Sequence, residues 1–154
     1  MNEAVVAAAV AAAGLNLTPA ALGAWVWSRG DPGGGEARVF WIALRVGQLA
    51  ALAFAIAIGV LAAAGHYSSE HLFYLYALLP LAVAFVAEQQ RVVSAQAILD
   101  KRGLEGSAAV AALPDGEQHL LMMEVVRREL GVMALSAFVA AGLLLRAAST
   151  AHGI

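Results

Sequence analysis

Six polar side chains are the strongest candidates for chemistry in this sequence, because they interrupt or border long apolar stretches. These residues, which we call the polar layer, are Arg45, Gln48, Glu88, Arg91, Arg128 and Glu129. Ionisable groups are costly at membrane depth, so they are paired, serve a function, or extend to the headgroups. Guanidinium suits bidentate pairing with carboxylate, so two acids and three arginines can form a network. Structural pairing or extension to the headgroups is the main interpretation, and a proton or ion pathway using Glu88 and Glu129 is the alternative.

The polar-layer residues are grouped because they lie at similar distances from the outer ends of their predicted helices. Three positions mark the outer ends of the segments that carry them: Gly65, Leu72 and Arg146. Counted from those ends, Gln48, Glu88 and Glu129 lie 17, 16 and 17 residues in, which is roughly 24–26 Å at about 1.5 Å per residue. The apolar core of a bilayer is about 30 Å thick, so all three fall just inside its inner boundary.

Each acid of the polar layer is expected to find an arginine on another helix. Arg45 and Arg91 lie about one turn beyond the acids, and Arg128 is next to Glu129. We predict that Glu88 pairs with Arg45 or Arg128 and that Glu129 pairs with Arg91. Spacing alone leaves open which arginine takes which acid.

Other reactive side chains give a weaker signal. The four histidines fall at loops, in a charged stretch or in the tail: His66, His71, His119 and His152. Haem between spans needs histidines that face the bundle interior at matched depths. The chain has no cysteine and carries no HExxH or Ser-His-Asp signature. We therefore expect no cofactor, no metal and no catalytic residue, and a protein that is not an enzyme.

The stretch Asn16-Leu17-Thr18-Pro19 interrupts the first apolar segment. One interpretation is a broken helix that binds a substrate, as in transporters. The other is a helix bent at Pro19, whose missing N–H weakens the backbone ladder, with Asn16 bonded to a neighbouring helix. Because no second interruption matches the first, we favour the bent helix.

Composition places all of these residues in a membrane protein. Of the 154 residues, 62% are hydrophobic and 13% are charged, against roughly 25% charged in soluble domains. Four long apolar segments predict one all-α domain, a four-transmembrane-helix bundle, with spans at about 4–27, 39–65, 72–90 and 128–147. The net charge of −2 argues against a nucleic-acid partner.

The stretch Leu72–Arg102 is expected to organise the chain. It is uncharged up to Ala87 and polar afterwards, and as a helix it is longer than the bilayer core. The last apolar segment follows a charged part in the same way, so the third and fourth long helices should extend together into a hairpin at about 88–129. Its seam is predicted from helical spacing: Val92, Ala95 and Leu99 against Leu121, Val125 and Val126.

Two shorter patterns predict a helix start in the hairpin and a helix-packing face in the first span. Asp115 followed by Gln118 resembles an N-cap with its partner. In the first span, small residues suit close packing between helices: Ala8, Ala12 and Gly14.

Basic residues predict the orientation. Arginine and lysine gather in the first and third connections and their flanks, whereas the N-terminus and the second loop have none. Basic loops stay in the cytoplasm, so the hairpin should be cytoplasmic and both termini outside it. Aromatic residues fit the boundaries: Trp25, Trp27 and Trp41 on the inner side, and Tyr67, Phe73, Tyr74 and Tyr76 on the outer side.

Three runs carry a resemblance to a known group: LYALLPLAVAFVAEQQR (Leu75–Arg91), LDKRGLE (Leu99–Glu105) and RRELGVMAL (Arg127–Leu135). They resemble small four-span integral membrane proteins of actinobacteria, a group without an established activity. The resemblance covers about the latter two thirds of the chain. It implies a bacterial plasma membrane and nothing about binding or catalysis.

These observations favour a non-enzymatic accessory or scaffold subunit of a plasma-membrane complex. Its partners would be the lipid bilayer and other membrane protein subunits, or further copies of itself. The first alternative is a small transporter or channel, proton-coupled through the polar layer. The second is a redox subunit that binds haem or quinone.

Overall fold

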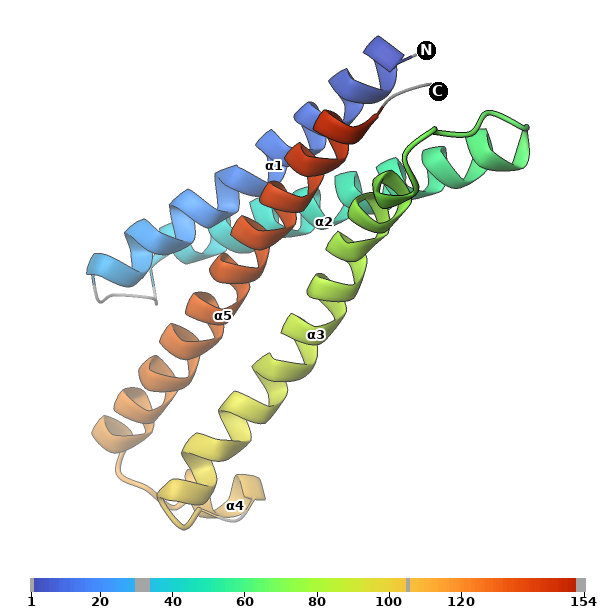
Figure 1. The fold of residues 1–154 in the computed structure, drawn as a ribbon. Helices are drawn as coiled ribbons and strands as arrows, with labels where there is room; N and C mark the ends of the chain where they lie inside the picture. Colours follow the sequence, from blue (N-terminus) through green and yellow to red (C-terminus); the bar gives the residue numbers. More distant parts are fainter. Residues whose placement is uncertain (1, 30–33, 105, 152–154) are drawn as a thin grey trace.

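The chain is all-α in the computed structural model, which describes residues 2–29, 34–104 and 106–151 (Figure 1). The helices are α1 (Asn2–Arg29), α2 (Gly35–Ala63), α3 (His71–Lys101), α4 (Gly106–Ala111) and α5 (Asp115–Thr150). All except α4 are long and apolar enough to cross a membrane, so the predicted all-α architecture with four helices of membrane-spanning length is confirmed. The start of α1, the end of α5 and the α2–α3 loop lie at one end of the bundle, here called the terminal end; α4 lies at the other, the hairpin end.

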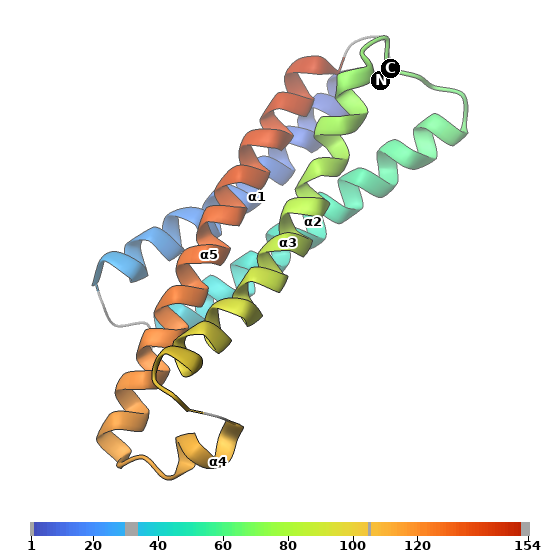
Figure 2. The same cartoon turned by 60° about the horizontal axis from the view of Figure 1, so that its bottom comes forward.

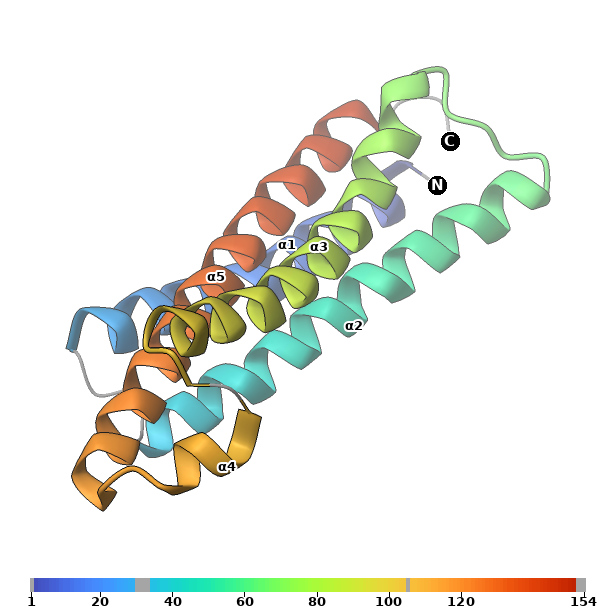
Figure 3. The same ribbon diagram turned by 90° about the horizontal axis from the view of Figure 1, so that it is seen from below.

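Helix α5 makes the two most extensive helix–helix interfaces of the bundle. It lies along both α1 and α3, whereas α2 packs mainly on α1 (Figure 3). In α5, 50% of the apolar window is buried, against 22% in α3. The expectation that residues 72–102 organise the chain is therefore wrong, because a long helix with a polar end need not be the one with neighbours on two sides.

Glycine ends α2 and α3 in the same way. Gly65 and Gly103 have φ values of 87° and 66°, which side chains with a Cβ adopt only at a cost. The next residue in each case donates its N–H to the carbonyl five positions back, at 3.0 Å: His66 to Leu61, and Leu104 to Leu99. This is the Schellman motif, and it stops α3 where the sequence predicts.

Helices α1 and α2 are joined at Asn16, which is buried. Its Nδ2 donates to the carbonyl of Ala12 and to that of Gly47 in α2, both at 2.9 Å. Pro19 lacks the N–H that would bond to the Leu15 carbonyl, and a methyl group at Gly47 would lie 2.9 Å from that oxygen. The predicted bond from Asn16 to a neighbouring helix is confirmed, and α1 continues as a helix through Pro19.

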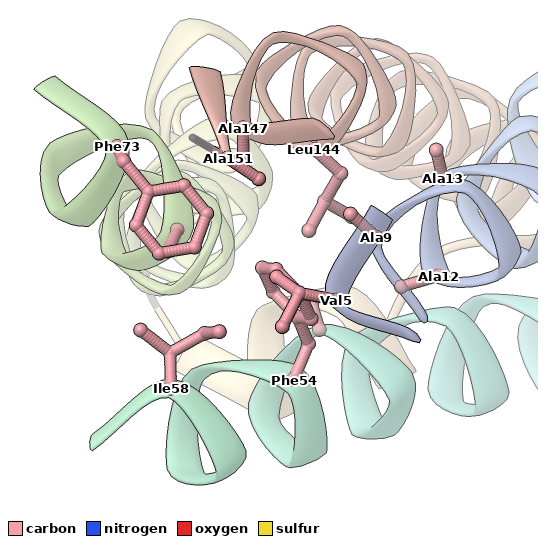
Figure 4. Packing of buried hydrophobic residues seen from close by; sticks show 12 residues of the cluster. Val5, Ala9, Ala12, Ala13, Phe54, Ile58, Phe73, Leu144, Ala147 and Ala151 are labelled. Carbon is pink, nitrogen blue, oxygen red and sulfur yellow. The ribbon is translucent and has the colours of Figure 1, made fainter. Parts of the chain in front are cut away.

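Among the described residues, two apolar clusters lie inside the bundle. One joins all four long helices near the terminal end and includes Phe54 and Phe73 (Figure 4). The other includes Phe40, Leu130 and Met133. Phe73 is fully buried, so its expected place in the outer aromatic belt is wrong; the Tyr74 hydroxyl, by contrast, accepts the N–H of Ser68 at 2.9 Å in the α2–α3 loop.

The small residues of α1 pack inside the chain, but on a face that differs from the predicted one. Ala12 is buried as expected, whereas Ala8 and Gly14 are exposed. Ala9 and Ala13, one position away from the exposed pair, are completely buried. Consecutive positions on a helix point about 100° apart, so an error of one residue changes the face.

At the hairpin end, α3 and α5 extend past the ends of α1 and α2, and α4 lies beside the start of α5 (Figures 1 and 2). The seam between α3 and α5 uses Ser94, Ile98 and Leu121, all buried. Leu121 was expected there, but Val92 is 66% exposed. An ion pair between Arg102 and Glu124 joins the same two helices.

The start of α5 differs from the predicted cap. Asp115 is the first helical residue, and Pro114 holds the N-cap position without a side-chain hydrogen bond. Gln118 instead donates back to the Leu113 carbonyl at 2.7 Å and to the Ala111 carbonyl at 3.3 Å. The glutamine therefore ties the end of α4 to α5. Asp115 still suits the first turn, where a negative charge favours the helix dipole.

Candidate functional site

The structure brings together five of the six polar-layer residues, on α2, α3 and α5. On α2, Arg45 and Gln48 are one turn apart and therefore share a face. Arg45 Nη1 donates to Gln48 Oε1 at 2.7 Å and to Glu88 Oε1 on α3 at 2.6 Å. Of the two arginines expected for Glu88, Arg45 is the one that pairs with it. This pair links two helices that have few other contacts.

Arg91 continues the network from α3 to α5. Its Nη1 lies 3.4 Å from the second oxygen of Glu88, and its Nε lies 3.4 Å from Glu129 Oε2. The expected pair between Arg91 and Glu129 is therefore present. Glu129 is the more shielded acid, with 20% of its side chain exposed against 31% for Glu88.

Trp41 belongs to the network and was not expected there. Its ring centroid lies 5.2 Å from the Arg91 guanidinium carbon, and it packs edge-on against Phe40. Such contacts stabilise a cation over an aromatic face. A signal existed in the sequence, because Trp41 and Arg45 are four residues apart and so lie on one face of α2.

Arg128 does not join the polar layer, which corrects the sequence-based grouping. It faces the opposite side of α5, beside Trp27 of α1. Its neighbour Glu129 points to α3. Adjacent helical residues do not face each other, so only one of this pair can reach the interior of the network. Depth alone places both residues at one level and says nothing about their direction.

The network suits a role in joining helices. Guanidinium keeps its proton in proteins, so a proton relay through Arg45 and Arg91 would be interrupted at each arginine. Every buried side-chain nitrogen and oxygen of the described residues also has a hydrogen-bond partner. These buried atoms therefore need no ligand or ion to complete their hydrogen bonds.

A small cavity lies among the four long helices, next to the polar layer. It has a volume of about 10 Å³, and its walls include Asn16, Gln48, Pro80 and Ser136. A single water needs about 10–15 Å³ on this scale. The cavity therefore has room for at most about one water.

The histidines lie apart from the polar layer. His66 and His71 flank the α2–α3 loop and His119 is on the first turns of α5, all exposed; His152 lies outside the described residues. Within the described ranges, no three histidine or acidic side chains come together in a group that could hold a metal ion.

Comparisons with protein-family models, curated proteins and solved structures found no match to this chain. No residue role therefore carries over from a known protein. The resemblance to actinobacterial four-span proteins stays a prediction.

Proposed function

We propose that this chain is a non-enzymatic accessory subunit of a bacterial plasma-membrane complex, and that it binds its partner through the hairpin formed by α3, α4 and α5. The observation that carries the proposal is an apolar groove of about 400 Å³ between these helices. Its lining includes Leu99, Val110, Leu121, Met122 and Val126.

The position of this groove along α5 indicates that it lies beyond the apolar core of the bilayer. Leu121 lies 25 residues from Arg146, or about 37 Å along the helix, beyond a core of about 30 Å. Met122 is 61% exposed there. Apolar surface that faces water instead of lipid is typical of a protein interaction site. An apolar segment of another subunit is the partner that fits it.

Purification in a mild detergent followed by mass determination tests the proposal. We expect a complex heavier than one chain with a defined second protein. Met122→Glu should release that protein, because it places a charge in the groove. Leu120→Glu is the matched control, since Leu120 is 65% exposed but does not line the groove. A lone monomer from native membranes would contradict the proposal.

The transporter alternative depends on water reaching Glu88 and Glu129. A cavity with room for about one water favours a packed, structural network over a conduction path. Proteoliposomes provide the direct test: we expect no proton flux with the native chain. Flux that disappears in Glu88→Gln, with folding intact, would support the transporter and overturn the accessory role.

A further inference from the structure

A second groove runs between α1 and α5 on the side of the bundle away from α3. It is open and has a volume of about 800 Å³, within the range of ligand-binding sites. Its rims are formed by large apolar side chains from both helices: Leu17, Trp27, Leu135 and Phe138. Leu135 and Phe138 are more than 60% exposed, so these rims face the lipid.

The floor of the groove is explained by contacts within the chain. A methyl group at Gly23 would lie 2.5 Å from Ala134 Cβ and 2.7 Å from a ring carbon of Phe40. Gly23 and Ala134 are small because α1 and α5 touch there. The floor therefore needs no partner helix to account for its composition.

Two arginines give the hairpin end of the groove a positive charge. A smaller hollow of about 370 Å³ shares Trp27 and Arg128 with the groove and adds Met123, Glu124 and Arg127. The Arg127 guanidinium carbon lies 5.2 Å from the Trp27 ring centroid.

The acids nearest to these arginines along α5 are already engaged. Glu124 pairs with Arg102, and Glu129 pairs with Arg91. Among the residues that the structure describes, neither Arg127 nor Arg128 forms an ion pair. The hollow therefore presents two unpaired guanidinium groups and one carboxylate, Glu124, whose charge is offset by Arg102, so it keeps a positive charge that can receive an anion.

The depth of the arginines matches the phosphate level of a bilayer. Arg128 lies 18 residues from Arg146, or about 27 Å along α5, at the edge of a core of about 30 Å. The groove leads from there into the apolar region. The charged end of the groove thus lies at the depth of a phospholipid headgroup, and its apolar part lies at the depth of the acyl chains.

We propose that this groove binds one anionic phospholipid, with the phosphate at Arg127 and Arg128 and an acyl chain between α1 and α5. Guanidinium binds phosphate oxygens through paired N–H donors, and basic pockets between membrane helices select anionic headgroups. A partner helix would have to bring a carboxylate to the same depth to satisfy the two arginines. The proposal does not depend on the hairpin groove or its partner.

Lipid binding can be measured on the purified full chain. The probes are phosphatidylglycerol and phosphatidylcholine, added to protein in a delipidating detergent, with bound lipid counted by native mass spectrometry. We expect one tightly held phosphatidylglycerol, bound at least tenfold more tightly than phosphatidylcholine. In Arg127→Gln/Arg128→Gln that preference should fall about tenfold.

A matched control separates this site from general attraction between basic residues and anionic lipid. The control is the double variant Arg29→Gln/Arg38→Gln. It also removes two arginines, and both are exposed and lie outside the groove. The control should keep most of the preference. Equal losses in both double variants would overturn the proposal.

A second variant tests the apolar part without changing charge. Ala24 is exposed and lines the groove, so Ala24→Phe should fill it and reduce lipid retention. Ala11→Phe, on an exposed position of α1 outside the groove, should not. Unchanged retention in Ala24→Phe would overturn the proposal. So would a dimer that Ala24→Phe converts to monomer, because a second chain would then be the occupant.

Discussion

At the level of single residues, a few polar side-chain contacts join the helices of the bundle and fix their relative positions. Glu88 receives hydrogen bonds from Arg45 on α2 and Arg91 on its own helix. Asn16 joins α1 to α2 through the Gly47 carbonyl. Such contacts are specific because an unpaired polar group in an apolar setting is costly. Each can be tested against a similar residue that lacks the contact.

Glu88→Gln should lower the free energy of unfolding by about 1–2 kcal/mol. Hydrogen bonds to charged groups contribute about 1.5–3 kcal/mol, and partial exposure of the pair reduces this. Unfolding followed by circular dichroism in detergent measures the change. Glu36→Gln is the control, since its 3.7 Å pair with Arg29 is well exposed. Equal values for the two variants would contradict a stabilising polar layer.

The charge-swapped protein extends this test. Arg45→Glu combined with Glu88→Arg should recover part of the stability that either change removes alone, because the interhelical pair is restored with reversed polarity. Arg91 would then lie beside a new arginine, so full recovery is not expected.

Gly47→Ala should destabilise the chain by about 1–3 kcal/mol, the usual cost of overpacking. The added methyl would lie 2.9 Å from the Leu15 carbonyl and 3.0 Å from Asn16 Oδ1. Gly59→Ala is the control on the same helix, because nothing lies within 4 Å of its added methyl. It should be neutral or stabilising by up to about 1 kcal/mol. A neutral Gly47→Ala would mean that α1 and α2 can separate freely.

At the scale of elements, the hairpin is a packed extension of α3 and α5. The two helices meet through a buried seam and the ion pair from Arg102 to Glu124. Helix α4 is tied to α5 by the side chain of Gln118. These contacts favour a folded hairpin over two separate helix ends.

Leu121→Ala should cost about 2–4 kcal/mol, because it leaves a cavity at a side chain that is 2% exposed. Trypsin should cut the native protein first at Lys101 or Arg102, at the exposed end of α3, and spare Arg91. In Leu121→Ala, cleavage at Arg91 should appear. Leu120→Ala should behave as the native chain does, and early cleavage of the native chain at Arg91 would contradict a packed hairpin.

At the scale of the whole molecule, the two ends of the bundle differ in charge. The hairpin end carries most of the arginines, and the terminal end carries few charges. By the positive-inside rule the hairpin end should face the cytoplasm. The chain has no cysteine, so single cysteines report on orientation without background.

Ser69→Cys, in the α2–α3 loop, should react with a membrane-impermeant maleimide in intact cells. Ala112→Cys, between α4 and α5, should react only after the cells are opened. Both positions are exposed, so a difference in labelling reports the side of the membrane. The reverse pattern would place both termini in the cytoplasm and overturn the predicted orientation.

Features that depend on distance along a helix can be predicted from the sequence alone. Hydropathy predicts the four long helices, glycine predicts the end of α3 at Gly103, and depth predicts that Glu88 and Glu129 share one level. These properties are local, because rise per residue and apolar length do not depend on the neighbours.

The buried face of each helix, by contrast, is known only from the folded bundle. Arg128 and Glu129 lie on different sides of α5. Ala9 and Ala13 are buried, whereas Ala8 and Gly14 are exposed. Helix α5 makes the most extensive contacts with its neighbours. In a soluble protein, polar residues mark the outer face of a helix. In a membrane, lipid and protein interior are equally apolar, so the rotation of a helix about its axis leaves little trace in hydropathy and is set by packing.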